Sequence, residues 1–283
     1  MEDGQSYKIG FVIQARMGSK RLPKKILKNL PFNSKDTLIG NIIKRLKKSR
    51  YFSKIVVASS IEKENNELEL YLNDEFSIEC FRGDEYDVLS RFIEIQKKEK
   101  FDIIVRLTAD NPCLDSKLLD EAIDNHIISK ADYSYTKDYP LGMNFEVING
   151  EEFLKIENEE KKVEEKEHVT LFFRNRPESY RLNYIENYEE KKLEELRLTV
   201  DTNEDYYLQC VLHDKFPNNI YFSLEDIVKL KKTEPWIFEI NKKTKQKSNS
   251  SILKDEICDG IEVLIKYGYD RASDLLRNQL NDF

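Results

Sequence analysis

Short apolar runs alternate with longer amphipathic segments along the first 135 residues of the chain. In the longer segments apolar residues recur three or four positions apart, as in Leu38, Ile42 and Leu46, which is typical of helices with one buried face. Short strands alternating with such helices indicate a parallel sheet joined by crossover helices. The five predicted strands in this half are Lys8–Ile13, Lys54–Ala58, Ser77–Phe81, Phe101–Leu107 and Asp132–Tyr135.

The second half of the chain carries a looser pattern. Its predicted elements, two strands and then two helices, are Phe145–Ile148, Arg181–Ile185, Glu164–Phe173 and Glu204–Phe216. We therefore expect an α/β fold in residues 1–247, with a doubly wound, mostly parallel, Rossmann-like sheet. The polar stretch 241–251 predicts a linker, and apolar residues at helical spacing beyond it predict a short helical C-terminal extension in residues 248–283.

The composition is that of a folded protein with excess negative charge. Of 283 residues 40% are apolar, which is enough for a core, and 46 basic against 53 acidic side chains give a net charge of −7. This balance argues against a general nucleic-acid-binding protein, which needs a basic face. No apolar run approaches the roughly 20 residues of a membrane span and the first residues show no secretory signal, so we expect a cytoplasmic protein without membrane contact.

The four cysteines have neither the spacing of a zinc site nor that of a disulfide framework. In a cytoplasmic protein such cysteines are expected to be reduced and mostly buried, because a free thiol behaves as a small apolar group.

A strongly basic loop follows the first predicted strand. Between Arg16 and Lys28 there are six Lys or Arg side chains and no acidic one, in a chain whose net charge is negative. Gly18 and Ser19 in the middle can expose backbone N–H groups, which together with cationic side chains bind phosphates. A solvated basic loop without a ligand is the alternative, but the position after the first strand of an α/β sheet favours a polyphosphate site.

The same loop, QARMGSKRLPKK, resembles the amino-terminal signature of the nucleotidyltransferases that activate acidic sugars with CTP. These include the Kdo and acylneuraminate cytidylyltransferases and, most similar here, the spore-coat polysaccharide biosynthesis type. Further matching segments follow in the family's order, FRGDEYDVLSR, VRLTADNP, EHVT and LTVDTNED, so that the resemblance spans roughly residues 8–247. It implies the nucleotide-diphospho-sugar transferase form of the α/β fold. The chain departs from the signature at Lys24, where Gly is usual, so the backbone around Lys25 is open to a different placement.

The resemblance also implies a nucleotide-binding site. Its members are Ala15, Arg16, Gly18, Ser19, Arg21, Lys25, Arg82, Asp87 and Arg106. Arg16 and Lys25 are expected at the β- and γ-phosphates, where their charges stabilise departing pyrophosphate. Asp87 has the alternative of capping the helix that begins at Val88, and Arg91 has that of pairing with Asp87.

Two aspartates directly after predicted strands, Asp110 and Asp201, are the best-placed metal ligands. Transfer of a nucleotidyl group needs charge neutralised on both sides of the α-phosphorus, and Mg²⁺ is commonly held by one or two carboxylates plus phosphate oxygens and water. The resemblance implies the same pair as ligands and counts Asp110, Arg16 and Lys25 as catalytic. Each aspartate has the alternative of capping the next helix, a role that Asp205 fits better.

The acceptor side has two candidates. Glu146 ends a segment that resembles the family's acceptor-facing stretch, but Asn144 replaces its usual Asp and leaves the acceptor open. His168, in EHVT, is the other candidate, with a structural role as the alternative. His126 and His213 are expected to be structural.

These features predict a Mg²⁺-dependent cytidylyltransferase that transfers CMP from CTP to an acidic sugar or related metabolite and releases pyrophosphate, for surface polysaccharide or glycan biosynthesis. A GT-A-like glycosyltransferase is one alternative, but neither Asp110 nor Asp201 has an aspartate two positions away. A non-catalytic scaffold of the same fold is another, disfavoured because the candidate catalytic residues are all present. The helical extension must pack on the domain or on a second subunit, and we favour a homodimer.

Overall fold

The computed structural model describes residues 6–186, 193, 195–217, 219–244 and 253–280. The chain divides into two units, Met1–Lys242 and Lys243–Phe283. The predicted domain boundary between residues 247 and 248 lies outside the described residues.

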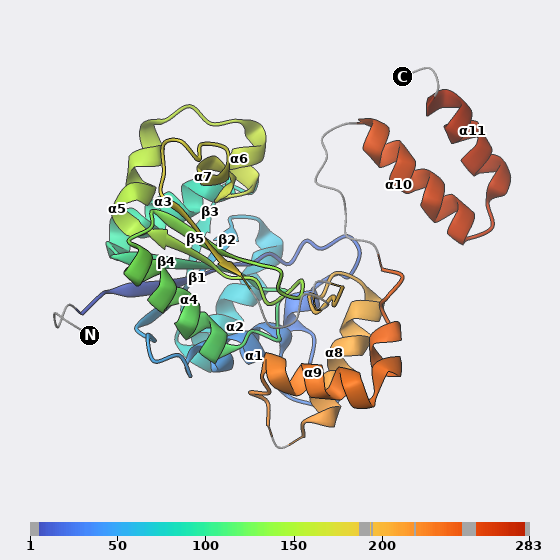
Figure 1. Cartoon of the computed structure of the whole chain (residues 1–283), viewed down its shortest axis with the longest axis horizontal. Coiled ribbons are helices and arrows are strands. Elements are labelled where there is room, and N and C mark those ends of the chain that lie inside the picture. The colour runs from blue at the N-terminus through green and yellow to red at the C-terminus, as the bar shows by residue number, and fades with distance from the viewer. Residues whose placement is uncertain (1–5, 187–192, 194, 218, 245–252, 281–283) are drawn as a thin grey trace. The chain divides into compact units, whose positions relative to one another are not determined.

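A seven-stranded sheet forms the centre of the first unit, in the order β3-β2-β1-β4-β6-β5-β7 (Figure 1). Its strands are β1 Ile9–Gln14, β2 Lys54–Ser60, β3 Glu79–Gly83, β4 Ile103–Thr108, β5 Tyr133–Lys137, β6 Glu146–Asn149 and β7 Leu182–Glu186. The first four strands are parallel, β6 is antiparallel to β4 and β5, and β7 is parallel to β5. All the predicted strands are present with small shifts of their ends, and the predicted mostly parallel α/β sheet is confirmed.

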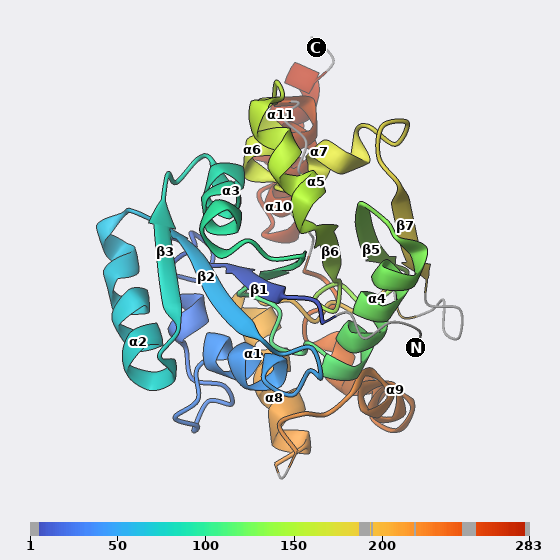
Figure 2. The same ribbon diagram turned by 90° about the vertical axis from the view of Figure 1, so that its left-hand side faces the viewer.

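Helices cover both faces of this sheet (Figure 2). Their bounds are α1 Leu38–Leu46, α2 Asn66–Phe76, α3 Val88–Glu99, α4 Ser116–Ser129, α5 Gly150–Lys155, α6 Val163–Glu167, α7 Leu171–Arg174, α8 Asn203–Lys215 and α9 Leu224–Thr233. Side chains of β1 alternate between the two faces, as the pleat requires. Phe11 and Ile13 share a core with residues of α1, α2 and α4, whereas Val12 shares one with residues of α3, α5 and α7. The sheet is therefore buried on both sides, and its carboxyl edge is left for the site.

The predicted helix Glu164–Phe173 is wrong in one respect, because the chain forms two short helices, α6 and α7, with a break between them. His168 at the end of α6 has φ −104° and ψ 78°, which is not helical. The break allows the Thr170 hydroxyl to donate to the Glu146 carboxylate at 2.5 Å. A long-range hydrogen bond to a buried charge thus outweighs the local helical pattern.

A third apolar cluster lies outside the sheet and packs α8 against α9 and the 3-10 helix Pro235–Glu239. Leu198, Leu208, Leu212, Ile227 and Ile237 are buried in it. This cluster fixes the start of α8 and therefore the segment just before it, which carries Asp201.

The second unit contains the predicted helical extension. Its helices α10 Leu253–Lys266 and α11 Asp270–Leu280 are joined by a turn in which Gly268 has φ +75°, a left-handed conformation that favours glycine. Among its described side chains Ile261 is buried, while Val263, Ile265 and Leu275 are exposed.

Two expectations from the composition concern the whole chain. Over the described residues no helix combines the length and apolar character needed to span a bilayer. All four cysteines are free thiols: Cys113 is buried, Cys80 and Cys210 are partly buried, and Cys258 is exposed rather than buried.

Candidate active site

The basic loop after β1 keeps several backbone N–H groups open. Ala15 N–H donates to Ala58 O at 3.1 Å, and Met17 N–H donates to the Asn65 side chain at 2.8 Å. The backbone is therefore fixed on both sides of Arg16. In the described part of the chain the N–H groups of Arg16 and Gly18 donate to no protein acceptor. A set of free N–H groups on a fixed loop is a feature of anion-binding sites.

Lys24 adopts the left-handed conformation that glycine adopts most readily, with φ 55° and ψ 25°. The departure from the family signature therefore leaves the backbone shape intact, at a cost of about 1 kcal/mol for a residue with a Cβ atom. Directly afterwards the 3-10 helix Lys25–Leu27 turns Lys25 inward, where the residue is 8% exposed. Lys25 thus faces Asp110 and Asp201 although Lys24 departs from the signature.

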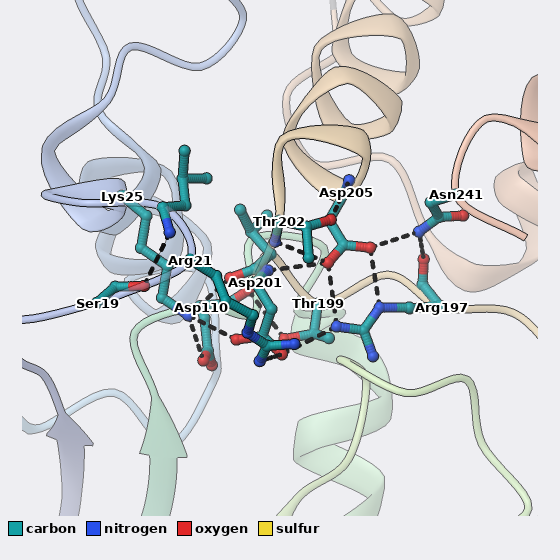
Figure 3. Close-up of polar contacts among 12 residues, drawn as sticks. Ser19, Arg21, Lys25, Asp110, Arg197, Thr199, Asp201, Thr202, Asp205 and Asn241 are labelled. Carbon is teal, nitrogen blue, oxygen red and sulfur yellow. Dashed lines mark hydrogen bonds and ion pairs between the residues drawn. The ribbon is translucent and has the colours of Figure 1, made fainter. Parts of the chain in front are cut away.

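Lys25 joins the two predicted metal ligands (Figure 3). Its Nζ atom donates to Asp110 Oδ2 at 3.0 Å, to Asp201 Oδ1 at 2.9 Å and to the Val200 carbonyl at 2.7 Å. Residues far apart in the sequence thus meet at one cation, as the prediction for Asp110 and Asp201 requires. We call Lys25, Asp110 and Asp201 the two-aspartate cluster.

Backbone contacts bring Asp201 to Asp110. Val200 N–H donates to the Asp110 carbonyl at 2.8 Å, so the chain before α8 runs beside the end of β4. Gly142 packs closely against the same segment before α8. Its φ is +102°, and a Cβ atom there would lie 2.5 Å from Thr199 N, so a residue with a side chain would not fit. Asp110 and Asp201 therefore belong to the carboxyl edge of the sheet, where ligands of such folds bind.

Each aspartate is anchored through one oxygen and offers the other to the cation. Asp110 Oδ1 accepts a 2.6 Å hydrogen bond from Thr108, and Asp201 Oδ2 accepts from Arg197 at 2.9 Å and from Arg21 at 3.1 Å. Burial lowers the pKa of Lys25, but the charges of the two aspartates outweigh it and hold that pKa above its ordinary value. Burial raises the pKa of Asp201, but Lys25, Arg21 and Arg197 hold it below its ordinary value.

This donor set fits a divalent cation. Among the described residues no three His, Cys, Asp or Glu side chains come together as a complete metal site. The two aspartates nevertheless turn one oxygen each toward the same positive charge, and a hard ion such as Mg²⁺ takes one or two carboxylates and completes its shell with phosphate oxygens and water. In this structure the Lys25 ammonium lies at the position toward which these two oxygens point.

A second group of charges surrounds Glu146. Its Oε1 atom accepts from Tyr133 at 2.6 Å, Thr170 at 2.5 Å and Arg174 at 2.9 Å, while Arg106 binds Oε2. Burial raises the pKa of Glu146, but Arg106 and Arg174 outweigh it and bring the pKa down to about 2. We call these five residues the Glu146 cluster. Glu146 is paired with Arg106 across β4 and β6, so this cluster also lies at the carboxyl edge.

The remaining predicted residues lie in other contacts. Arg82 spans from β3 to the start of α2, where it donates to the Ser60 and Glu62 carbonyls and pairs with Glu69 at 2.6 Å. Asp87 caps α3 by accepting from Ser90 N–H at 2.8 Å, which agrees with its alternative role. His168 is half-buried at the end of α6, where its N–H donates to the Glu164 carbonyl at 2.8 Å.

Other predicted or alternative roles are also visible. Arg91 contacts the Ala58 and Glu85 carbonyls rather than Asp87, at 3.4 and 3.3 Å. Ser19 Oγ accepts from Leu22 N–H at 3.3 Å and stiffens the basic loop. His126 is buried against Ser134 at 2.8 Å, as its structural role predicts.

Sequence reasoning missed several residues of the site, among them Thr108, Arg174 and Arg197. Thr108 lies in the segment VRLTADNP, two positions before Asp110, and Arg197 directly precedes the segment LTVDTNED, four positions before Asp201. Arg174 lies four positions after Thr170, the last residue of EHVT. Their closeness to motif residues was the available signal, but only the fold shows which carboxylate each one contacts.

An α/β sheet with a basic loop of open N–H groups after β1 and two aspartates at its carboxyl edge is typical of nucleotidyltransferases. The sequence model of the family "Cytidylyltransferase" matches residues 11–245. The chain belongs to the cytidylyltransferase family and is an enzyme of the CTP-using nucleotidyltransferase type.

Individual relatives agree with this assignment. The chain is 35% identical over 230 residues to the spore coat polysaccharide biosynthesis protein SpsF of Bacillus subtilis, covering 80% of this chain and 94% of the relative. A cytidylyltransferase structure from Leptospira borgpetersenii has a TM-score of 0.76 and 29% identity, covering 87% of this chain and 99% of that one. A CMP:2-keto-3-deoxy-manno-octonic acid synthetase in complex with CTP, at 13% identity and a TM-score of 0.55, covers 74% of this chain and 99% of that one and shares the fold.

Proposed function

We propose that this enzyme uses Mg²⁺ to transfer CMP from CTP to a hydroxyl group of an acidic sugar or a related acidic metabolite, releasing pyrophosphate, and that it acts in the cytoplasm, where CTP is available. The observation that carries this proposal is the meeting of Lys25, Asp110 and Asp201 beside the open N–H groups of the basic loop. A cation site next to an anion-binding loop is the arrangement that a metal-bound triphosphate requires.

The basic loop binds the β- and γ-phosphates in this proposal. Arg16 is exposed and makes no hydrogen bond within the described residues, so its guanidinium is free to take phosphate oxygens. Gly18 contributes its open backbone N–H group, whereas the Ser19 N–H donates to the Met17 carbonyl at 2.9 Å. Lys25 contributes a cation that already faces the site. Fixed positive charges aimed at departing pyrophosphate stabilise the transition state more than the ground state.

Asp110 and Asp201 would hold the metal ion, each through the oxygen that now contacts Lys25. The ion, when bound, neutralises charge on the α-phosphate and orients the triphosphate. In this proposal the Lys25 ammonium turns from the two aspartates to the phosphates when the metal ion binds, so that each aspartate keeps a positive partner.

The Glu146 cluster supports an acidic acceptor. Arg106 and Arg174 share the single carboxylate of Glu146, so the cluster carries a surplus positive charge. The Arg174 side chain is 42% exposed and its guanidinium stacks 4.2 Å from the Tyr135 ring centroid. We assign Arg174 to the acceptor's carboxylate and Glu146 to holding Arg174, with His168 as a further acceptor contact. SpsF is named for spore coat polysaccharide biosynthesis, and we propose that the CMP-activated product of this enzyme serves surface polysaccharide or glycan biosynthesis.

Pyrophosphate release tests the proposal. The protein is mixed with each of the four nucleoside triphosphates, Mg²⁺ and a panel of sugar acids, with the corresponding neutral sugars as matched controls. We expect release with CTP and at least one sugar acid, and none after chelation of the metal. Release with neutral sugars alone would contradict the acidic acceptor. In a second mixture that contains a nucleotide sugar in place of the triphosphate, turnover without pyrophosphate would favour the glycosyltransferase alternative.

For the C-terminal extension we propose a role in dimerisation, with residues 248–283 as a separate segment after the catalytic domain 1–247. Two short helices with Val263, Ile265 and Leu275 exposed are too small to be stable alone. Light scattering compares the full chain with one ending at residue 247. The same number of subunits in both proteins would contradict this role.

A further inference from the structure

Arg197 holds two aspartates at once. Its Nη2 atom donates to Asp201 Oδ2 at 2.9 Å and to Asp205 Oδ2 at 3.0 Å, and its Nε atom donates to Asp205 Oδ1 at 2.9 Å. Arg197 is therefore bidentate toward Asp205 and still reaches Asp201. Since a guanidinium is planar and rigid, this fixes the rotation of the Asp201 carboxylate.

Asp205 fixes the backbone of the same segment. It is fully buried, and its Oδ2 atom accepts the N–H groups of Asp201 at 3.0 Å and of Thr202 at 3.1 Å. Together with the Thr202 hydroxyl it forms the capping box of α8. Both the main chain and the side chain of Asp201 are thus held through Asp205.

Asn241 completes the network from the end of the first unit (Figure 3). It is buried, and its Nδ2 atom donates to Asp205 Oδ1 at 2.8 Å and to the Arg197 carbonyl at 2.9 Å. The segment after the 3-10 helix Pro235–Glu239 is in this way tied to the residues around Asp201.

We propose that Arg197, Asp205 and Asn241 form a positioning network that aims Oδ1 of Asp201 at the cation between the two aspartates. Because Oδ2 of Asp201 is taken by Arg197 and Arg21, only Oδ1 remains for the cation. The contacts of these three residues within the described part of the chain reach Asp201, directly or through Asp205, and not the Lys25 ammonium between the two aspartates. The inference rests on the proposed function, in that it takes a metal ion to bind between Asp110 and Asp201.

A purely structural role, capping α8, is the competing explanation, and the chain offers a matched control for it. Glu165 is also fully buried, belongs to the capping box of α6, and is held by Arg176 at 2.6 Å. The Arg176–Glu165 pair thus repeats the chemistry of Arg197–Asp205, but neither member contacts Asp110 or Asp201 within the described residues. Loss of either pair should lower the stability of the protein. Of the two arginines, only Arg197 should change the affinity for a metal ion between the two aspartates.

The experiment measures Mn²⁺ binding by electron paramagnetic resonance, with and without CTP, together with thermal unfolding of each variant. Arg197→Lys keeps the charge but cannot bridge both aspartates, and we expect Mn²⁺ affinity to fall about 10- to 100-fold, the range found for partners of metal ligands. Asn241→Ala should give a smaller loss in the same direction. Arg176→Lys should lower the melting temperature and leave Mn²⁺ affinity as in the wild type.

The outcomes separate the two claims. Wild-type Mn²⁺ affinity in a folded Arg197→Lys protein overturns the positioning network alone, and so does an equal loss in Arg176→Lys. If Arg197→Lys does not fold, Asn241→Ala decides, and unchanged affinity there overturns the network. Absence of Mn²⁺ binding by the wild type, even with CTP, overturns the metal part of the proposed function and the inference with it.

Discussion

Two groups of buried charges at the same edge of the sheet differ in how their carboxylates are used. In the two-aspartate cluster each carboxylate is anchored through one oxygen and gives the other to Lys25. In the Glu146 cluster one carboxylate receives four donors, and both of its oxygens are occupied. The first group therefore places two carboxylates around one ammonium, and the second places two guanidinium groups around one carboxylate.

The difference teaches what each group can bind. A carboxylate with a free oxygen, held in place by a neighbour, is prepared to ligate a metal ion. A carboxylate that is saturated with donors instead orients the arginines that hold it, and the exposed part of Arg174 then faces solvent. The same pairing of acid and guanidinium thus belongs to the proposed cation site in one place and to the proposed anion site in the other.

The strongest test of this contrast is Lys25→Ala. If Lys25 faces the triphosphate, the change removes a fixed cation from developing negative charge, which costs roughly 2.7–4 kcal/mol, or about 100- to 1000-fold in turnover. Because Lys25 also separates two aspartates, the free energy of unfolding should fall by about 1–3 kcal/mol. Pyrophosphate release and urea unfolding measure the two effects.

Lys24→Ala is the control for that variant, since Lys24 pairs with Glu67 on the surface. Its turnover should stay close to that of the wild type. Equal losses of turnover in the two variants would mean that the phosphate-facing lysine has been misassigned.

The next test is Asp110→Asn and Asp201→Asn, each of which keeps the shape and removes the charge. We expect turnover to fall at least about 100-fold in each, because the metal ion loses a ligand charge. The exposed Asp214→Asn in α8 is the matched control and should have no effect. A folded Asp110→Asn or Asp201→Asn protein with wild-type turnover at limiting Mg²⁺ would rule out that residue as a ligand.

The Glu146 cluster predicts a pH dependence of stability. The pKa of Glu146 in the folded chain is about 2, against an ordinary value of 4.5, so the unfolded chain takes up the proton first as the pH falls. Its stabilisation, about 3 kcal/mol, should be complete above pH 4.5 and be lost as the pH falls toward 2. Urea unfolding of the wild type and Glu146→Gln should show a difference that shrinks across this window. A constant difference would contradict the assignment.

The smallest expected effect is that of Lys24→Gly. Since Lys24 has a left-handed backbone, glycine removes a steric cost there, and the free energy of unfolding should rise by at most about 1 kcal/mol. Turnover should be unchanged, because the shape of the loop is the same. A loss of turnover would show that the Lys24 side chain takes part in the site.

Local patterns were enough to predict the sheet. The strands β1, β2 and β4 are short runs of mostly apolar residues between polar segments, and β1 to β4 alternate with amphipathic helices whose buried faces repeat at helical spacing. The predicted helix over Glu164–Phe173 failed at His168, because the bond from Thr170 to Glu146 joins residues that are distant in the sequence. Propensity describes neighbours along the chain, and a buried charge far away can outweigh it.

The sequence by itself determined the fold class, the basic loop and the candidacy of Lys25, Asp110 and Asp201, because strand ends and motif spacing are local properties. Only the tertiary structure decided that Lys25 lies between the two aspartates, with one oxygen of each left for a cation. It also showed that both oxygens of Glu146 accept hydrogen bonds, which distinguishes Glu146 from the two candidate metal ligands. The physical reason is that a carboxylate's role depends on which donors reach each oxygen, and those donors come from segments that only folding brings together.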